Sequence, residues 1–324
     1  MTNTVIHTYE LGEFTSELYE GEISYVRDED NHCARIVFNR PEQLNALPLA
    51  GFDYIKSLIK RAERDEAVKV IVLEGKGDNF GTGANANELG YYIGYGSGAD
   101  AKSRKAPTQR RRMIPDKDIV FGYESTIETV ARCMKVVICK VRGYCYGAHL
   151  QLAVAADIVV ATDNSMYTHP AWRYLGPLFN YAELVETVGL KKAKEMMLTC
   201  RPLNADEALR FGLITRVVAD AELDEAVDGY VAACSMQSLD GIAMGKGMME
   251  IVMDSRGFGI GASAGWIGHG WLTNLQLGDG DWNFMKSRRD KGLGAALRER
   301  DRMVPAFFRQ GEARKVADSS AAEG

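Results

Sequence analysis

The chain has 324 residues, of which 46% are hydrophobic and 26% charged, so it can bury a substantial core in one large domain or two smaller ones. Its formal net charge of -5 argues against a nucleic-acid partner, and no stretch approaches the ~20 apolar residues that span a bilayer. The N-terminus lacks a signal-peptide pattern and the six cysteines lack disulfide-framework spacing, so we expect a cytoplasmic protein with reduced core cysteines.

The predicted elements begin with an N-terminal extension over residues 1–22. Residues 23–40 predict a β-hairpin, because two apolar runs flank a polar turn. Apolar residues at helical spacing then predict an amphipathic helix over 49–67, and a β-branched run predicts a buried strand over 68–73. The order of two strands, a helix and a third strand is therefore present before residue 80.

The rest of the chain continues this alternation. A Gly-rich loop at 75–83 and a polar, locally basic stretch at 90–118 come first. The expected elements that follow are a helix at 123–133, a strand at 136–141, a helix at 148–156, a strand at 158–162, helices at 191–199 and 205–211, and a strand at 212–218. From Leu223 onward the pattern is mostly helical, and residues 311–324 are expected to be disordered. This alternation indicates an α/β architecture.

Two loops of small residues each follow a predicted strand and precede a helix. The first, FGTGANANEL (Phe80–Leu89), formally matches the dinucleotide fingerprint GxGxxG/A, but its first glycine lies well beyond the end of the strand, so the match is weak. The second, GYCYGA, ends at Ala148. Such loops expose backbone N–H groups, and two N–H groups converging on one point form an oxyanion hole for a carbonyl oxygen. Two turns packed for steric reasons alone are the alternative.

Four segments, in their order and spacing, resemble the crotonase superfamily, the enoyl-CoA hydratase/isomerase family. They are IVFNRPEQLNAL (36–47), VKVIVLEGKGDNFGTGANANEL (68–89), MKVVICKVRGYCYGAHLQLAVAADIVVA (134–161) and ADEALRFGLITRVV (205–218). The resemblance implies a crotonase fold, with a spiral of β-β-α turns over 23–220 and a helical trimerisation region over 221–310. It also implies an acyl-CoA substrate, with coenzyme A as part of that substrate, no further cofactor and no metal.

The resemblance also implies roles for individual residues. The N–H groups of Ala84 and Ala148 fall at the family's two oxyanion positions, and Gly83 and Asn85 flank the first of them. The region of the coenzyme A adenine falls on Asn45, Ala46 and Leu47. Candidates for the coenzyme A phosphates are basic residues at Arg110–Arg112, Arg288, Arg289 and Lys291.

The sequence departs from the family at both catalytic carboxylates. Family hydratases use two glutamates to act on a water molecule, and these positions are Gln151 and Ala171 here. An amide does not exchange protons near neutral pH and alanine has no polar group, so an ordinary enoyl-CoA hydratase is disfavoured. Gln151 either positions a water molecule or substrate oxygen, or is a hydrogen-bonded polar residue on a buried helix.

Other residues are candidates to replace the missing carboxylates. His169 lies two residues before Ala171, and in an extended segment such positions face the same side, so its imidazole is expected to reach the site. His149 is expected to be packed or hydrogen-bonded instead. Less certain candidates for the acyl pocket or for proton transfer are Tyr146, Trp172 and Glu183.

Trp172 is similar in position to a tryptophan of the family's coenzyme A dehalogenases. Those enzymes use an aspartate nucleophile further along the chain, but no aspartate occurs between Trp172 and Gly189, and Asn180 is the approximate counterpart. Dehalogenation through an aspartyl ester is therefore disfavoured.

We predict an acyl-CoA-transforming enzyme of the enoyl-CoA hydratase/isomerase type that stabilises a thioester enolate. One alternative is a hydrolase that opens a cyclic oxo-acyl-CoA by C–C cleavage, because Thr82, Gly83 and Asn85 are similar to family hydrolases of that kind. The other alternative is a noncatalytic acyl-CoA-binding subunit. The resemblance further implies a homotrimer or homohexamer, while charge and hydropathy give no reason to expect a nucleic-acid or membrane partner.

Overall fold

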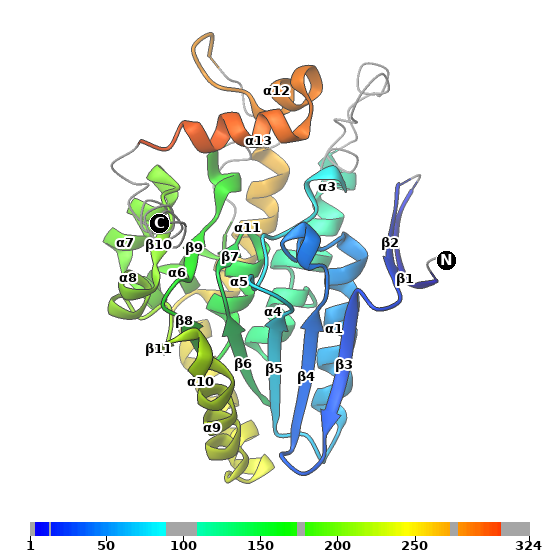
Figure 1. The fold of residues 1–324 in the computed structure, drawn as a ribbon, viewed down its shortest axis with the longest axis vertical. Coiled ribbons are helices and arrows are strands. Elements are labelled where there is room, and N and C mark those ends of the chain that lie inside the picture. Colours follow the sequence, from blue (N-terminus) through cyan, green and yellow to red (C-terminus); the bar gives the residue numbers. More distant parts are fainter. Residues whose placement is uncertain (1–3, 13, 89–108, 174–178, 273–277, 306–324) are drawn as a thin grey trace, which may run out of the picture.

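The computed structural model describes residues 4–12, 14–88, 109–173, 179–272 and 278–305. Its main sheet has six strands in the order β11-β8-β6-β5-β4-β3, and all neighbouring strands are parallel except the β3–β4 hairpin (Figure 1). The strands of this sheet are β3 (Ile23–Asp28), β4 (Cys33–Phe38), β5 (Val70–Gly75), β6 (Val136–Val141), β8 (Ile158–Thr162) and β11 (Arg216–Val218). The predicted α/β architecture is confirmed.

A smaller sheet carries the second glycine loop. It consists of β7 (Tyr144–Tyr146), β9 (Met166–Thr168) and β10 (Leu203–Asn204), with β9 in the centre. β7 runs parallel to β9, and β10 runs antiparallel to it. Because β7 leads directly into the next helix, this sheet determines where that helix begins.

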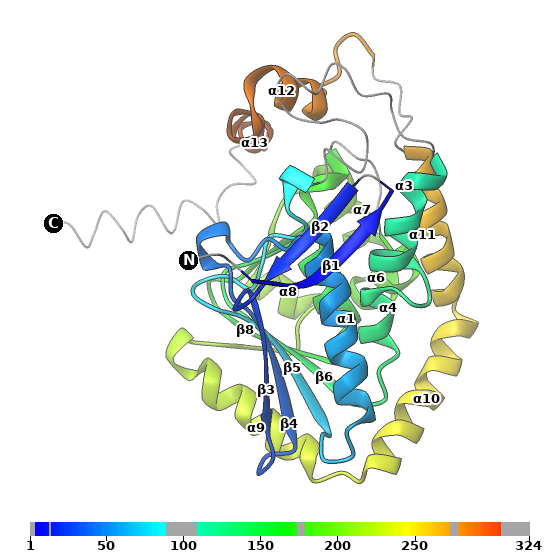
Figure 2. The same cartoon turned by 90° about the vertical axis from the view of Figure 1, so that its right-hand side faces the viewer.

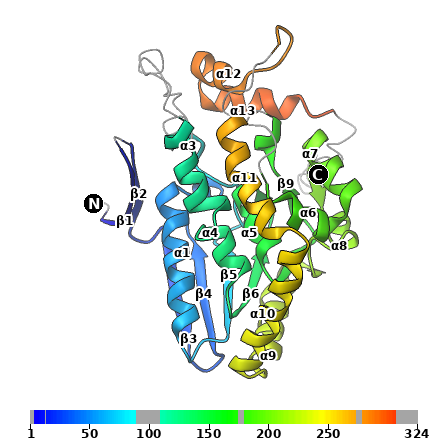
Figure 3. The ribbon, with the colours of Figure 1, turned by 180° about the vertical axis from the view of Figure 1, so that it is seen from behind.

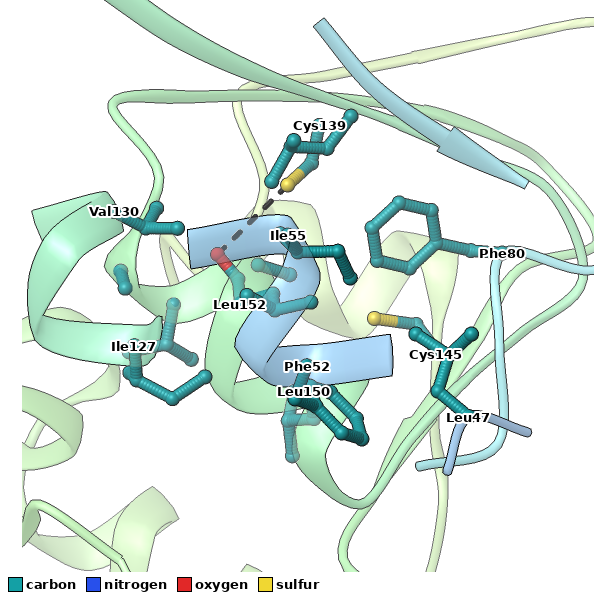
Figure 4. Close-up of a cluster of buried hydrophobic side chains, with 14 of the residues drawn as sticks. Leu47, Phe52, Ile55, Phe80, Ile127, Val130, Cys139, Cys145, Leu150 and Leu152 are labelled. Carbon is teal, nitrogen blue, oxygen red and sulfur yellow. Dashed lines mark hydrogen bonds between the residues drawn. The ribbon is translucent and has the colours of Figure 1, made fainter. Parts of the chain in front are cut away.

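Helices cover both faces of the main sheet, as the alternation of side chains along its strands requires. On β5, Ile71 and Leu73 belong to the core that includes α1 (Leu49–Arg64), α4 (Thr126–Ala131) and α5 (Ala148–Ala155). Val70 and Val72 point the other way, into a second cluster with α9 (Leu223–Ser235). Figure 4 shows the larger core around α5, where Leu150 and Leu152 lie among aliphatic and aromatic side chains.

The remaining helices surround this framework. They are α3 (Gln109–Pro115), the π-helix η3 (Asp116–Phe121), α6 (Tyr181–Val188), α7 (Leu190–Thr199), α8 (Ala205–Arg210), α10 (Leu239–Ser255), α11 (Phe258–Leu272), α12 (Phe284–Lys291) and α13 (Leu293–Arg302), with short 3₁₀ turns η1 (Pro41–Gln43), η4 (Pro170–Arg173) and η5 (Asp220–Glu222). α11 packs against α3, η3 and α6, and Figure 3 shows it beside these helices on the side of the sheet that α1 covers. The predicted C-terminal helices are therefore present. Among the described residues, each helix is too short or too polar to span a bilayer.

The N-terminal segment is more structured than the extension that we predicted. β1 (Val5–Leu11) and β2 (Phe14–Tyr19) form an antiparallel hairpin that lies against α1 (Figure 2). Ser16 fixes this contact, because its hydroxyl accepts a hydrogen bond from the Ala50 N–H and donates to the Glu88 carboxylate. The expected disorder of residues 311–324 lies outside the described part of the chain.

Candidate active site

The first glycine loop is held by strand-like pairing with the segment before α1. The Leu47 N–H donates to the Gly83 carbonyl at 3.0 Å, and the Asn85 N–H donates to the Leu47 carbonyl at 2.7 Å. In this parallel bridge between Leu47 and Ala84, the N–H of Ala84 itself points away from Leu47. Ala84 is half-buried, so this N–H lies near the surface of the loop.

The second loop brings Ala148 to the start of α5. Gly147, at φ +61°, caps this helix, and the Gly147 N–H donates to the Thr168 carbonyl on β9. The Ala148 N–H belongs to the first turn of the helix, whose N–H groups have no partner within the helix and carry its positive dipole end. Among the described residues, no hydrogen bond uses the N–H of Ala84 or of Ala148.

The two loops meet at their glycines. A Cβ atom added to Gly83 would lie 3.0 Å from the Ala148 nitrogen and 3.2 Å from the Gly147 Cα. Gly83 also has φ +90°, a conformation that glycine adopts readily and other residues do not. This contact brings the segments that carry the Ala84 and Ala148 N–H groups side by side, as the sequence reasoning required. The first glycine run is not in the context of a dinucleotide site, since β5 ends at Gly75, well before Gly81.

His149 connects the two loops. Its Nδ1 accepts a hydrogen bond from the Gly83 N–H at 2.9 Å, and its ring is packed edge-to-face against Phe38, Phe52 and Phe80. Burial lowers the pKa of His149 to about 3, so the imidazole is neutral. The expectation that His149 is packed or hydrogen-bonded is confirmed, but its partner, Gly83, was not foreseen.

Gln151 and His169 lie together one turn along α5. The Gln151 Nε2 is 3.5 Å from the His169 Nε2, and both residues are buried. The His169 ring stacks on Trp172 with ring centroids 5.3 Å apart. The sequence reasoning placed His169 in an extended segment, which is wrong: β9 ends at Thr168, and the chain enters η4, where Ala171 lies. His169 instead reaches Gln151 from the end of β9.

Glu183 lies at a different place. It faces a half-open cavity of about 230 Å³ bounded by α4, α5, α6 and α10, together with Glu128 and Arg132. Burial, reinforced by the charge of Glu128, raises the pKa of Glu183 to about 8. Among the described residues, no hydrogen bond joins the Glu183 carboxylate to Gln151 or His169, although α6 packs against α5. The Glu183 carboxylate therefore faces this cavity, and its role in the acyl pocket or in proton transfer stays a prediction.

The residues predicted near the coenzyme A adenine differ in their exposure. The Asn45 side chain is fully buried, accepts a hydrogen bond from the Arg40 N–H and donates to the carbonyls of Lys76 and Asn79. Leu47 is also buried, whereas Ala46 is half-buried. The amide of Asn45 thus holds the loop in shape, and within this triplet Ala46 is the residue with accessible surface.

Two further predicted site residues are partly accessible beside the loops. Tyr146 is half-buried and its ring lies 4.8 Å from that of Tyr144, between centroids. Asn85 is half-buried, and its Oδ1 accepts a hydrogen bond from the Asn87 N–H. Tyr146 directly precedes Gly147 of the second glycine loop, and Asn85 directly follows Ala84 of the first.

Of the basic candidates, Arg288 approaches the first loop. It is 3% exposed and donates to the Asn87 carbonyl at 3.3 Å. Arg289 pairs with its neighbour Asp290, and Lys291 pairs with Glu299. Arg110 is exposed, while the side chains at 111 and 112 lie outside the description.

Comparisons with known proteins identify the family of this chain. Residues 28–254 match the enoyl-CoA hydratase/isomerase family model, and the chain belongs to this family, which confirms the resemblance to the crotonase superfamily. It is 26% identical over 204 residues to the peroxisomal Delta(3,5)-Delta(2,4)-dienoyl-CoA isomerase of Arabidopsis thaliana, covering 62% of this chain and 71% of the relative. It is 31% identical over 217 residues to the "Probable enoyl-CoA hydratase echA12" of Mycobacterium bovis, covering 66% and 72%.

Solved structures show the same fold. An enoyl-CoA hydratase/isomerase from Xanthobacter autotrophicus Py2 superposes with a TM-score of 0.72 at 25% identity, covering 88% of this chain and 99% of the other. An enoyl-CoA hydratase from Mycobacterium smegmatis gives a TM-score of 0.72 at 21% identity, covering 87% and 93%. The predicted crotonase fold is thereby confirmed.

Proposed function

We propose that this protein is an acyl-CoA-transforming enzyme that stabilises a thioester enolate between the N–H groups of Ala84 and Ala148. The observation that supports this proposal most is the close approach of Gly83 to the second loop. A Cβ atom added to Gly83 would lie 3.0 Å from the Ala148 nitrogen. With both N–H groups donating to the thioester oxygen, negative charge that develops there is stabilised, and the N-terminal end of α5 adds to the effect. Each such donor contributes roughly 10²- to 10³-fold in rate.

His169 is the proposed proton-transfer group. Among Gln151, His169, Ala171 and Trp172, it is the side chain that can exchange protons near neutral pH. Hydration in the manner of the family requires two carboxylates, whereas moving a double bond requires one base that removes a proton at one carbon and returns it at another. A single imidazole therefore favours isomerisation within the hydratase/isomerase class. Gln151, 3.5 Å from His169, is suited to orient the imidazole or a substrate oxygen.

We also propose that the active form is a homotrimer or homohexamer assembled through the C-terminal helices. Met244, Met248 and Ile251 on α10 are at least 70% exposed, an unusual amount of apolar surface on one helix. Light scattering after size exclusion should give three or six times the monomer mass for the wild type. Met248→Glu should reduce it, and a wild-type monomer would overturn this part of the proposal.

The reaction can be identified from its products. The purified protein is incubated with linear enoyl-CoA, cyclic enoyl-CoA and cyclic oxo-acyl-CoA thioesters in water labelled with oxygen-18 and deuterium. The products are identified, and the positions of their labels located, by fragmentation mass spectrometry. A shifted double bond without oxygen-18 indicates isomerisation, with the deuterium content measuring how far the transferred proton exchanges with solvent, and a labelled hydroxyl indicates hydration. A labelled new carboxylate would indicate ring-opening hydrolysis. Coenzyme A binding without any product would overturn the enzymatic proposal in favour of a binding subunit.

The role of His169 is tested by substitution. His169→Ala should lower kcat by roughly 10²- to 10⁴-fold while the Kd for the thioester changes little, because acid–base catalysis contributes that much. His32→Ala is a matched control, since His32 is exposed and the one hydrogen bond of its ring among the described residues is to the Ala67 carbonyl. Equal activity of the two variants would show that another group moves the proton.

A further inference from the structure

We infer that His149 is a positioning residue that sets the distance between the two carbonyl-binding loops. The inference rests on the proposed function of Ala84 and Ala148. The side chain belongs to α5, whose first residue is Ala148, and its Nδ1 accepts a hydrogen bond at 2.9 Å from the N–H of Gly83, the residue before Ala84. The His149 side chain therefore links the two proposed donors: His149 follows Ala148 in the chain, and its imidazole is hydrogen-bonded to Gly83, which precedes Ala84.

The apolar surroundings of the His149 ring indicate that its hydrogen bond to Gly83 is the reason for a histidine at this position. His149 is fully buried and three phenylalanine rings lie edge-on to it, at centroid distances of 5.2 Å, 5.8 Å and 5.5 Å for Phe38, Phe52 and Phe80. An apolar residue would suit such packing. It would, however, leave the Gly83 N–H unpaired in a buried loop, which costs stability and lets the loop move.

Gly81 leaves room for the ring. A Cβ atom on Gly81 would lie 2.3 Å from both Cδ2 and Nε2 of His149, closer than any real contact. The Gly81 N–H and carbonyl are hydrogen-bonded to Tyr144 and Tyr146 on β7, so the backbone at Gly81 is itself fixed. The imidazole is therefore held on one side by the backbone of the first loop and on the others by aromatic rings. This rigidity is what a spacer between two hydrogen-bond donors requires.

The hydrogen bond also defines the protonation state. An Nδ1 that accepts a hydrogen bond must be the unprotonated nitrogen of a neutral ring, with the proton on Nε2. Among the described residues, Nε2 has no hydrogen-bond partner. His149 therefore has no route for passing a proton to the site, and the two histidines have separate tasks: His169 for proton transfer and His149 for geometry.

The test compares two variants at this position. His149→Phe keeps a planar ring but has no acceptor, whereas His149→Asn places an amide oxygen near the position of Nδ1. The reporter is the carbonyl stretching frequency of a bound thioester labelled with carbon-13 at that carbonyl, measured by isotope-edited infrared spectroscopy. In the wild type we expect a shift to lower frequency on binding, because two N–H donors polarise the bond.

We expect His149→Phe to lose most of this shift and at least tenfold in kcat, with the Kd for coenzyme A unchanged, and His149→Asn to recover part of both. A role in packing alone would lower the melting temperature of both variants and leave the carbonyl shift intact. A full carbonyl shift in His149→Phe would overturn the inference while leaving the proposed function in place. Absence of the shift in the wild type would overturn the proposed oxyanion hole and, with it, the inference.

A measurement on the wild type covers the case in which His149→Phe does not fold. In protein labelled with nitrogen-15 histidine, the His149 signals should be those of the Nε2–H tautomer and should not titrate across neutral pH. A protonated Nδ1, or titration in that range, would overturn the inference.

Discussion

Replacing Gly83 with alanine tests the contact on which the proposed site depends. Gly83 has φ +90°, and the new methyl group would lie 3.0 Å from the Ala148 nitrogen and 3.2 Å from the Tyr146 carbonyl oxygen. Both neighbours are backbone atoms that cannot rotate away. The loops must therefore separate by a few tenths of an ångström, or the methyl group must occupy the space in front of the Ala148 N–H.

The expected magnitudes follow from these two effects. A non-glycine residue in this backbone region costs about 1–3 kcal/mol of unfolding free energy. Losing one oxyanion donor lowers kcat by roughly 10²- to 10³-fold, which corresponds to about 3–4 kcal/mol in the transition state. We therefore expect Gly83→Ala to be a folded, moderately destabilised enzyme with a large loss of kcat. Urea unfolding and steady-state kinetics on the identified thioester measure the two effects separately.

Gly21→Ala is the matched control. Gly21 has φ +86°, nothing lies within 4 Å of an added Cβ, and it is in an exposed turn between β2 and β3. This variant should lose a similar amount of stability from backbone strain and keep the wild-type kcat. If Gly83→Ala loses no more kcat than Gly21→Ala at equal loss of stability, the contact between the loops does not serve catalysis and the reasoning fails.

Three further predictions concern stability. The pKa of Glu183 in the folded protein, about 8, lies above its unfolded value of 4.5. The stability contributed by the protonated carboxyl group is therefore complete below pH 4.5 and is lost as the pH rises through the folded pKa of about 8. Glu183→Gln should remove this loss of stability, on the order of a few kcal/mol, in urea titrations at acidic, neutral and alkaline pH. Asn45→Ala removes the three hydrogen bonds of a buried side chain and should lower the unfolding free energy by roughly 2–5 kcal/mol. An effect no larger than that of Asn31→Ala, an exposed residue, would contradict a structural role. Glu88 accepts from the Leu49 N–H at the start of α1, so Glu88→Ala should cost about 1–3 kcal/mol in thermal unfolding and Glu88→Gln less; equal losses would contradict the importance of its hydrogen bonds.

The fold was largely predictable because most of its helices and strands have the expected periodicity of apolar residues in the sequence. β6 matches the predicted strand over 136–141, and α1 begins at the predicted Leu49. The N-terminal hairpin was missed because the surface it packs on, α1, lies further along the chain. The helix expected over 123–133 is shorter, since Ser125 caps it and its hydroxyl accepts from the Glu128 N–H.

The loops of the candidate site could be located in the sequence, but the contacts between them could not. The two glycine loops and His169 could be identified from their spacing and residue types. The hydrogen bond from Gly83 to His149 could not, because it joins residues 66 positions apart. The position of Glu183 was also not readable, since the neighbour that interacts with it, Glu128, comes from α4, a separate part of the chain.

The two faces of the sheet have a practical consequence for labelling. Of the six cysteines, five are buried and Cys234 alone is half-buried, on the α9 side, where it packs against the smaller cluster. Burial raises the pKa of its thiol, so alkylation should be slow but selective. A fluorophore attached there would report the detachment of α9 from the sheet during unfolding, on the opposite face of the sheet from the core that contains α5.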